Sequence, residues 1–127
     1  MNTDITVLVV DDDWHIIENI KHHLKKMGFT NIKTADTGAN ALQQALVVNF
    51  GLVLSDWNMP DMDGLELLQN IRAIPSLEST PFLMITSNSD KQSVINAIKG
   101  GVEYYIVKPF EGKTLRSKIE EILGSQI

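Results

Sequence analysis

The sequence contains no cysteine among its 127 residues, so disulfide bonds, thiolate zinc sites and a cysteine nucleophile are all excluded. This absence leaves the redox compartment undetermined. No apolar run approaches the length that crosses a membrane, and residues 1–10 lack the basic stretch and long apolar segment of a signal peptide. We therefore expect a cytoplasmic protein without membrane insertion.

Basic residues are scarce, with 11 Lys and Arg against 16 Asp and Glu and a net charge of -5. Nucleic-acid binding draws most of its affinity from Lys and Arg, so we expect no nucleic-acid partner. The length and the 43% hydrophobic content fit one globular domain. No linker or low-complexity tract is visible, and we expect a single domain over residues 1–127 without an output domain.

Short apolar runs alternate with segments of helical periodicity, which is the pattern of repeated βα units around a parallel sheet. This predicts an α/β fold of five such units, with helices on both faces of the sheet. The predicted strands are Ile5–Val10, Asn31–Ala35, Leu52–Ser55, Phe82–Thr86 and Tyr104–Val107.

Apolar residues at helical spacing predict the buried side of each helix. The first helix follows Asp13, stops at Gly28 and buries Ile17, Ile20, Leu24 and Met27. The other four are expected at about 39–48 (burying Leu42, Ala45, Leu46), from Gly64 (Leu65, Leu68, Ile71), from Ser89 or Asp90 (Val94, Ala97, Ile98) and after Glu111 (Leu115, Ile119, Ile122).

Polar residues follow the predicted strands at the edge where such sheets bind ligands. They are Asp11, Asp12 and Asp13 after the first strand, Asp56 after the third, Thr86 after the fourth and Lys108 after the fifth. Carboxylates gathered at one edge need compensating cations, and a hard divalent ion with one lysine would supply them. Mg²⁺ suits these oxygen ligands, and Asp56 is the candidate nucleophile toward phosphorus.

Each of these residues also has a purely structural interpretation. Asp13 is expected to cap the first helix, Thr86 is a common strand-end residue, and Lys108 before Pro109 can be a solvated charge. The three histidines, His15, His22 and His23, fit no zinc motif, so we interpret them as solvated helix residues. Taken singly, the polar residues leave these alternatives open.

Together, the pair Asp11-Asp12, the segment from Ser55 to Gly64 (SDWNMPDMDG), Thr86-Ser87 and Lys108-Pro109-Phe110 resemble the response-regulator receiver family. The resemblance covers essentially the whole chain and implies the flavodoxin-like (βα)5 fold with strand order 2-1-3-4-5. It implies that a histidine kinase phosphorylates Asp56. It also implies roles for six further residues. Asp12 and the Asn58 backbone carbonyl would bind Mg²⁺ with Asp56, Asp11 would act mainly through water, and Thr86 and Lys108 would hold phosphoryl oxygens. Tyr105 would be an aromatic switch, and the Lys108-Pro109 bond would be required to be cis.

The likeness is strongest to chemotaxis-type members, which implies a monomeric signal carrier to a flagellar motor switch protein and a phosphatase that resets it. We expect no turnover of an independent substrate beyond its own phosphorylation and dephosphorylation. The chain departs from the usual pattern at Asp13-Trp14-His15, at Ser87 to Asp90 and at Glu103-Tyr104. A phosphate sink, or a regulator with a different protein partner, is the alternative; a constitutive adaptor and a two-metal hydrolase are less favoured.

Overall fold

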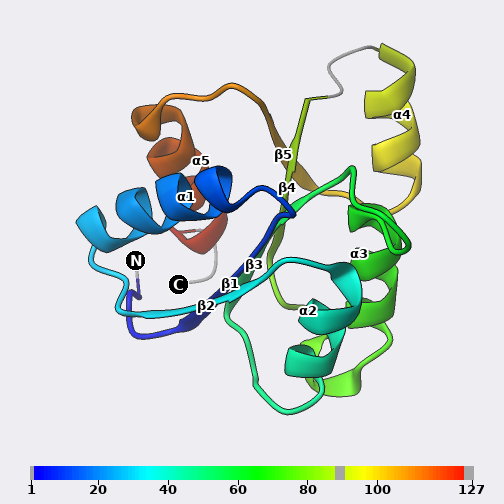
Figure 1. Ribbon diagram of the computed structural model, residues 1–127, viewed down its shortest axis with the longest axis horizontal. Helices are drawn as coiled ribbons and strands as arrows, with labels where there is room; N and C mark the ends of the chain where they lie inside the picture. Colours follow the sequence, from blue (N-terminus) through cyan, green and yellow to red (C-terminus); the bar gives the residue numbers. More distant parts are fainter. Residues whose placement is uncertain (1, 88–90, 125–127) are drawn as a thin grey trace.

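The computed structural model describes residues 2–87 and 91–124 as a single parallel sheet covered on both faces by helices (Figure 1). Strands and helices alternate along the chain. The elements are β1 (Thr6–Val10), α1 (Trp14–Lys26), β2 (Asn31–Ala35), α2 (Gly38–Ala45), β3 (Leu52–Asp56), α3 (Gly64–Arg72), a 3₁₀ turn at Pro75–Leu77, β4 (Phe82–Thr86), α4 (Lys91–Lys99), β5 (Tyr104–Val107) and α5 (Gly112–Gly124).

The strand order is β2-β1-β3-β4-β5, and every neighbouring pair is parallel. This confirms the flavodoxin-like α/β fold and the order that the family resemblance implied. Parallel pairing brings the carboxyl ends of all five strands to the same edge of the sheet. None of the helices in the described ranges is both long enough and apolar enough to span a bilayer.

Alternation along β1 divides the core into two layers, because successive side chains point to opposite faces of a strand. Leu8 and Val10 pack with α2, α3 and α4, whereas Val7 and Val9 pack with α1 and α5. Figure 1 shows α1 and α5 together on one side of the sheet and α2 and α3 on the other. The central strands β3 and β4 are buried along their whole length.

Side-chain caps set where the first three helices begin. Asp13 accepts a hydrogen bond from the His15 amide at 2.9 Å, as the sequence predicted for the start of α1. Thr37 and Asp63 play the same part at α2 and α3. Gly28, with φ of 104°, follows α1 in the left-handed conformation that commonly ends a helix.

The prediction for α2 was wrong at the C-terminal end of the helix. The helix begins at Gly38, close to the predicted start near residue 39, but it ends at Ala45 instead of Val48. Leu46 therefore lies beyond the helix and is 66% exposed, while Ala41 takes the buried position on its face.

Two further helices differ from prediction in which side chains they bury. In α3 the buried residues are Leu67, Leu68 and Ile71, and Leu65 is only partly buried at the margin of the core. In α4, Ala97 is buried but Ile98 is 60% exposed. The predicted start of α4 at Ser89 or Asp90 lies outside the described residues. The predicted buried positions of α1 and α5 are confirmed, with Met27 partly buried.

Asp61, in the loop between β3 and α3, has a positive φ of 69°. A β-branched residue is strained in this region, whereas glycine is not. We expect Asp61→Val to lower the free energy of unfolding by about 1–2 kcal/mol, and Asp61→Gly to leave it within about 0.5 kcal/mol. Urea unfolding of the two variants checks this, and an equal loss in both would mean that the aspartate side chain, not the backbone, matters.

Candidate functional site

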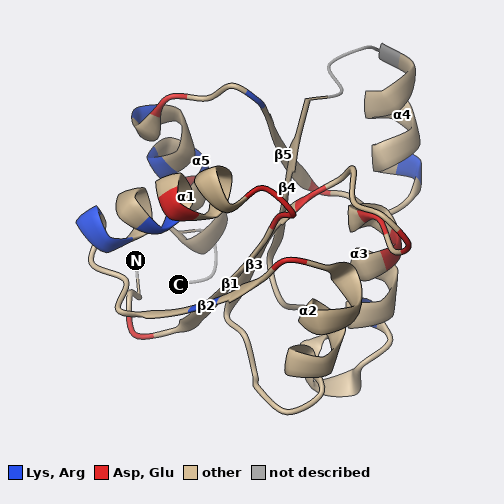
Figure 2. Cartoon of the chain, in the orientation of Figure 1, with Lys and Arg blue, Asp and Glu red and all other residues tan. Residues whose placement is uncertain are grey.

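Three carboxylates meet at the carboxyl edge of the sheet. Asp11 follows β1, Asp56 ends β3, and together with Asp12 they offer oxygen atoms that lie within 4.8 Å of one another. Figure 2 shows these acidic positions converging where β1 and β3 end. Asp11 and Asp56 are 1% and 7% exposed, whereas Asp12 is exposed to solvent. The site is thus acidic, with two buried carboxylates and one, on Asp12, that solvent can reach.

Lys108 supplies the cation that such a cluster requires. Its Nζ lies 2.9 Å from Asp11 Oδ2 and 3.2 Å from Asp56 Oδ1, so one ammonium group bridges two buried carboxylates. Lys108 is the residue directly after β5, and its backbone amide donates a 2.7 Å hydrogen bond to the Thr86 carbonyl. The ends of four strands therefore fix the geometry.

The electrostatics of the site make Asp56 easier to protonate than an ordinary aspartate. Burial and the neighbouring charge of Asp11 raise the pKa of Asp56, and the charge of Lys108 only partly opposes this. For Lys108, burial lowers the pKa, but its hydrogen bonds and charge pairing with Asp11 and Asp56 outweigh burial and raise it. Lys108 is accordingly charged, but this one lysine compensates the negative charge of Asp56 only in part.

Asp11 already has a partner on each carboxylate oxygen. Its Oδ1 accepts from the Asp13 amide at 2.8 Å, and its Oδ2 accepts from Lys108. Asp13 itself is committed to capping α1. Asp12 is therefore the carboxylate most open to an added ion.

The remaining residues singled out from the sequence surround this edge. Thr86, the last residue of β4, is 2% exposed, and Asn58 lies exposed in the loop after β3. Tyr105 lies on β5 with 36% of its surface exposed. The Lys108-Pro109 peptide bond is cis, as the resemblance implied.

Gly64 is a supporting residue to which the sequence analysis gave no role at the site beyond the start of a helix and a place in the Ser55 to Gly64 segment. Its amide donates a 2.8 Å hydrogen bond to the Trp57 carbonyl, and a Cβ placed on it would lie 2.3 Å from the Asp56 carbonyl oxygen. The loop that begins at Asp56 thus folds back against the start of α3. The signal in the sequence was a glycine directly after the capping Asp63.

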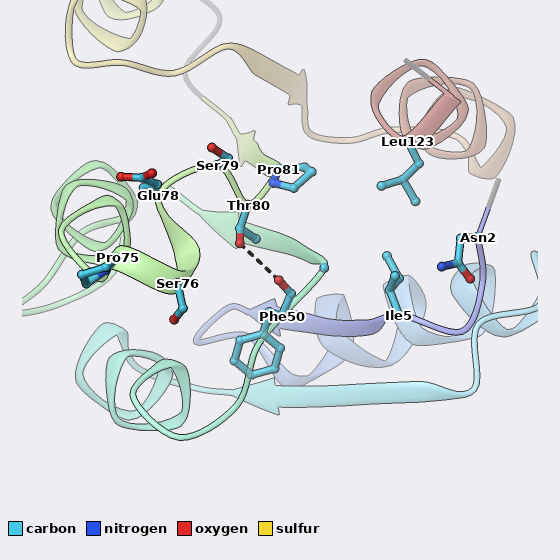
Figure 3. Close-up of a pocket in the computed structure, with 11 residues that line it drawn as sticks. Asn2, Ile5, Phe50, Pro75, Ser76, Glu78, Ser79, Thr80, Pro81 and Leu123 are labelled. Carbon is cyan, nitrogen blue, oxygen red and sulfur yellow. Dashed lines mark hydrogen bonds between the residues drawn. The ribbon is translucent and has the colours of Figure 1, made fainter. Parts of the chain in front are cut away.

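A different part of the surface holds a hollow of about 550 Å³, where the chain enters β1, β3 and β4 (Figure 3). Ile5 and Leu123 lie at the same end of it, and the Thr80 hydroxyl donates a 3.2 Å hydrogen bond to the Phe50 carbonyl. Glu78 is the one ionisable residue among those that line it. Its lining offers no paired acids and bases, so the chemistry belongs to the acidic edge.

The chemistry of the donors at the acidic edge fits Mg²⁺. Asp12 and Asp56 offer carboxylate oxygens, and the Asn58 backbone carbonyl is a further oxygen in the same loop region. Mg²⁺ prefers oxygen ligands, takes one or two carboxylates and retains water. The three residues of the cluster contribute no nitrogen or sulfur of the kind that zinc favours.

An open parallel sheet with a buried aspartate, flanking acids and a bridging lysine at its carboxyl edge defines the class: a flavodoxin-like α/β domain with an acidic, cation-compensated site. The sequence matches the response regulator receiver domain family over residues 7–120. The chain therefore belongs to the response regulator receiver family.

Named relatives agree with this assignment. The chain is 41% identical to chemotaxis protein CheY-3 of Vibrio cholerae over 122 residues, covering 96% of this chain and 94% of the relative. It is 41% identical to chemotaxis protein CheY of Pseudomonas aeruginosa over 116 residues, covering 91% and 94%. Its structure is similar to that of chemotaxis response regulator CheY4 of Vibrio cholerae, with a TM-score of 0.87 at 32% identity, covering 94% and 99%.

Proposed function

We propose that the chain is a two-component response regulator that accepts a phosphoryl group on Asp56 and carries a chemotaxis signal. The observation that carries this is the buried Asp56 carboxylate 3.2 Å from the Lys108 ammonium, in a chain with CheY relatives at 41% identity. Residues 1–127 would act as one receiver domain in the cytoplasm and present the signal on their own surface.

In the proposed reaction, a carboxylate oxygen of Asp56 attacks the phosphorus of a phosphohistidine on the kinase. The new O–P bond forms while the P–N bond to the donor histidine breaks, and the electron pair stays on that nitrogen. The Lys108 ammonium faces the oxygens that gain negative charge, and the Thr86 hydroxyl is a second donor at the same edge. Mg²⁺, when held by Asp12, Asp56 and the Asn58 carbonyl, would neutralise further charge on the phosphoryl group.

The proposed output surface lies on α4, β5 and α5. A phosphoryl group beside Thr86 and Lys108 adds charge and hydrogen-bond acceptors, which favours one packing of the adjacent elements over another. Tyr105 on β5 and Ile98 on α4 are both exposed and available to respond or to contact a partner. We propose that Tyr105 turns inward as Thr86 moves, which would change the surface offered to a flagellar motor switch protein.

The test is binding to the N-terminal segment of a motor switch protein from the same source, in Mg²⁺, with and without a phosphodonor. Mass spectrometry should find one phosphoryl group on the wild type and none on Asp56→Asn. We expect at least tenfold tighter binding for the modified protein. Modification without tighter binding would favour a phosphate sink or another partner, and an unmodified wild type would overturn the phosphoacceptor assignment.

Mg²⁺ binding should be visible through Trp57, which follows Asp56 directly. We expect a saturable change in its emission, measured in a Trp14→Phe background because Trp14 is 62% exposed and adds its own signal. At tenfold excess over the Kd, Mg²⁺ should raise the free energy of unfolding by roughly 1.4 kcal/mol. Asp12→Asn should weaken both responses, and a flat titration at constant ionic strength would contradict the metal assignment.

A further inference from the structure

Positive charge gathers on one part of this otherwise acidic chain. The chain carries a net charge of -5, yet Lys25 and Lys26 are the last two residues of α1, and Lys113 and Arg116 lie in the first turns of α5. Figure 2 shows Lys and Arg positions on the neighbouring helices α1 and α5. These two helices pack against each other on the same face of the sheet.

A groove of about 280 Å³ lies between these basic helix segments, and we call it the α1–α5 groove. No Asp or Glu is among its lining residues, which are His23, Lys26, Met27, Gly112, Lys113 and Arg116. The basic residues come from both helices, so the groove presents cations from two walls. It shares no lining residue with the Asp56 site.

The two walls of the groove are held in place before any ligand arrives. A Cβ on Gly112 would lie 2.4 Å from the His23 ring, so the imidazole packs directly on the start of α5. Burial, His22 and Lys26 together lower the pKa of His23, in that order of importance. Of these causes, Lys26 belongs to the groove itself. A preformed site costs a ligand less ordering free energy than one that must assemble.

The carboxylates near the groove compete only weakly for its cations. Arg116 pairs with Glu120 at 2.8 Å and Lys113 with Glu111 at 3.5 Å, and all four side chains are at least half exposed. Exposed pairs of this kind contribute about 0–1 kcal/mol, so an incoming carboxylate can replace them. Within the described ranges, Lys26 makes no ion pair at all.

We propose that the α1–α5 groove binds an acidic segment of a protein partner, with its carboxylates on Lys26, Lys113 and Arg116. Met27 is partly buried in the same groove and offers an apolar contact for a side chain of that segment. The interaction uses a surface other than the Asp56 edge and does not require phosphorylation.

A peptide fits these observations better than an anionic membrane does. The cations line a concave groove, whereas Glu18 and Glu121 are exposed on the same helices and do not line it. A flat anionic bilayer would meet those acids, while a narrow acidic segment would meet mainly the basic walls. Charge complementarity thus selects an extended acidic segment as the occupant.

Fluorescence anisotropy with a fluorescein-labelled peptide of Glu and Leu residues tests the proposal, in Mg²⁺-free buffer without phosphodonor. The double variant Lys26→Glu/Arg116→Glu should bind at least tenfold more weakly than wild type. Lys33→Glu is the matched control, because this exposed lysine on β2 points away from the face that carries α1 and α5. It should bind like wild type.

The outcomes separate this proposal from the proposed phosphorylation. The double variant should still take a phosphoryl group at Asp56, which also shows that it is folded. Equal peptide binding by wild type and the double variant would overturn the proposal, as would an equal loss in Lys33→Glu. Binding to phosphatidylglycerol vesicles without binding to the peptide would overturn it too. If wild type itself took no phosphoryl group, the proposed phosphorylation would be overturned, whereas the comparison of peptide binding would still decide whether the groove binds an acidic segment.

Discussion

Lys108→Met is expected to lower the free energy of unfolding by about 2–4 kcal/mol in metal-free buffer and to slow phosphoryl transfer to Asp56 by about 10²–10³-fold. Lys108 Nζ contacts both Asp11 and Asp56, which are almost fully buried. Removing the ammonium leaves two like charges facing each other without a counterion. It also removes the donor that, in the proposed mechanism, faces the charge developing on the phosphoryl oxygens.

Two measurements separate the stability effect from the catalytic one. Urea unfolding with increasing Mg²⁺ should recover part of the lost stability, because the ion compensates the same carboxylates. Single-turnover transfer from a phosphorylated kinase should stay slow even where the variant is fully folded. Lys99→Met, at the exposed end of α4, is the control and should change neither quantity. A normal transfer rate in Lys108→Met would remove Lys108 from the proposed mechanism.

The sequence was sufficient to predict β1, β3 and β4 because burial on both faces leaves a short, almost continuous apolar run in each of them. The predicted ranges of β2, β4 and β5 match the structure, and β1 and β3 differ by one residue. Asp56 belongs to β3, since its backbone still pairs with Ile85 of β4. A charged residue gives no local sign that the strand continues through it, so the prediction stopped at Ser55.

Helix faces were harder to predict where apolar residues are more numerous than buried positions. Leu65, Leu67 and Leu68 all precede Ile71, and a spacing rule alone selects Leu65 with Leu68 and Ile71. The structure buries Leu67 because α3 faces both the sheet and α2, which widens its buried side. The spacing rule also assigned Leu46 to the core, but α2 ends at Ala45 and Leu46 lies beyond the helix. Only the packing of neighbouring helices decides such cases.

The acidic edge was predictable in outline because parallel strands bring the residues that follow them to one edge. The pairing of Lys108 with Asp11 and Asp56 was not predictable. Lys108 lies 97 residues from Asp11, and only the folded sheet brings its Nζ to 2.9 Å from that carboxylate. The α1–α5 groove depends in the same way on how two helices distant in sequence pack. Its basic residues look like ordinary solvated charges when each helix is considered alone.

Gly64→Ala is expected to lower the free energy of unfolding by about 2–3 kcal/mol, a large effect for one methyl group. The added Cβ would lie 2.3 Å from the Asp56 carbonyl oxygen, 2.7 Å from Met84 Sδ and 2.9 Å from Trp57 Cα. Two of these atoms belong to the backbone, so relieving the overlap requires movement of the chain segment that carries Asp56, the proposed phosphoacceptor. The methionine sulfur alone could move aside at little cost.

The same displacement should reach the chemistry, because Asp56 and Gly64 are joined through the Trp57 carbonyl. We expect phosphoryl transfer to Gly64→Ala to slow at least tenfold under conditions where the protein remains folded. Gly124→Ala is the matched control, since a Cβ there meets nothing within 4 Å. Unfolding in urea and mass spectrometry of the phosphorylated protein measure both effects. If Gly64→Ala matched Gly124→Ala in stability and rate, the close approach at Gly64 would not be holding Asp56 in position.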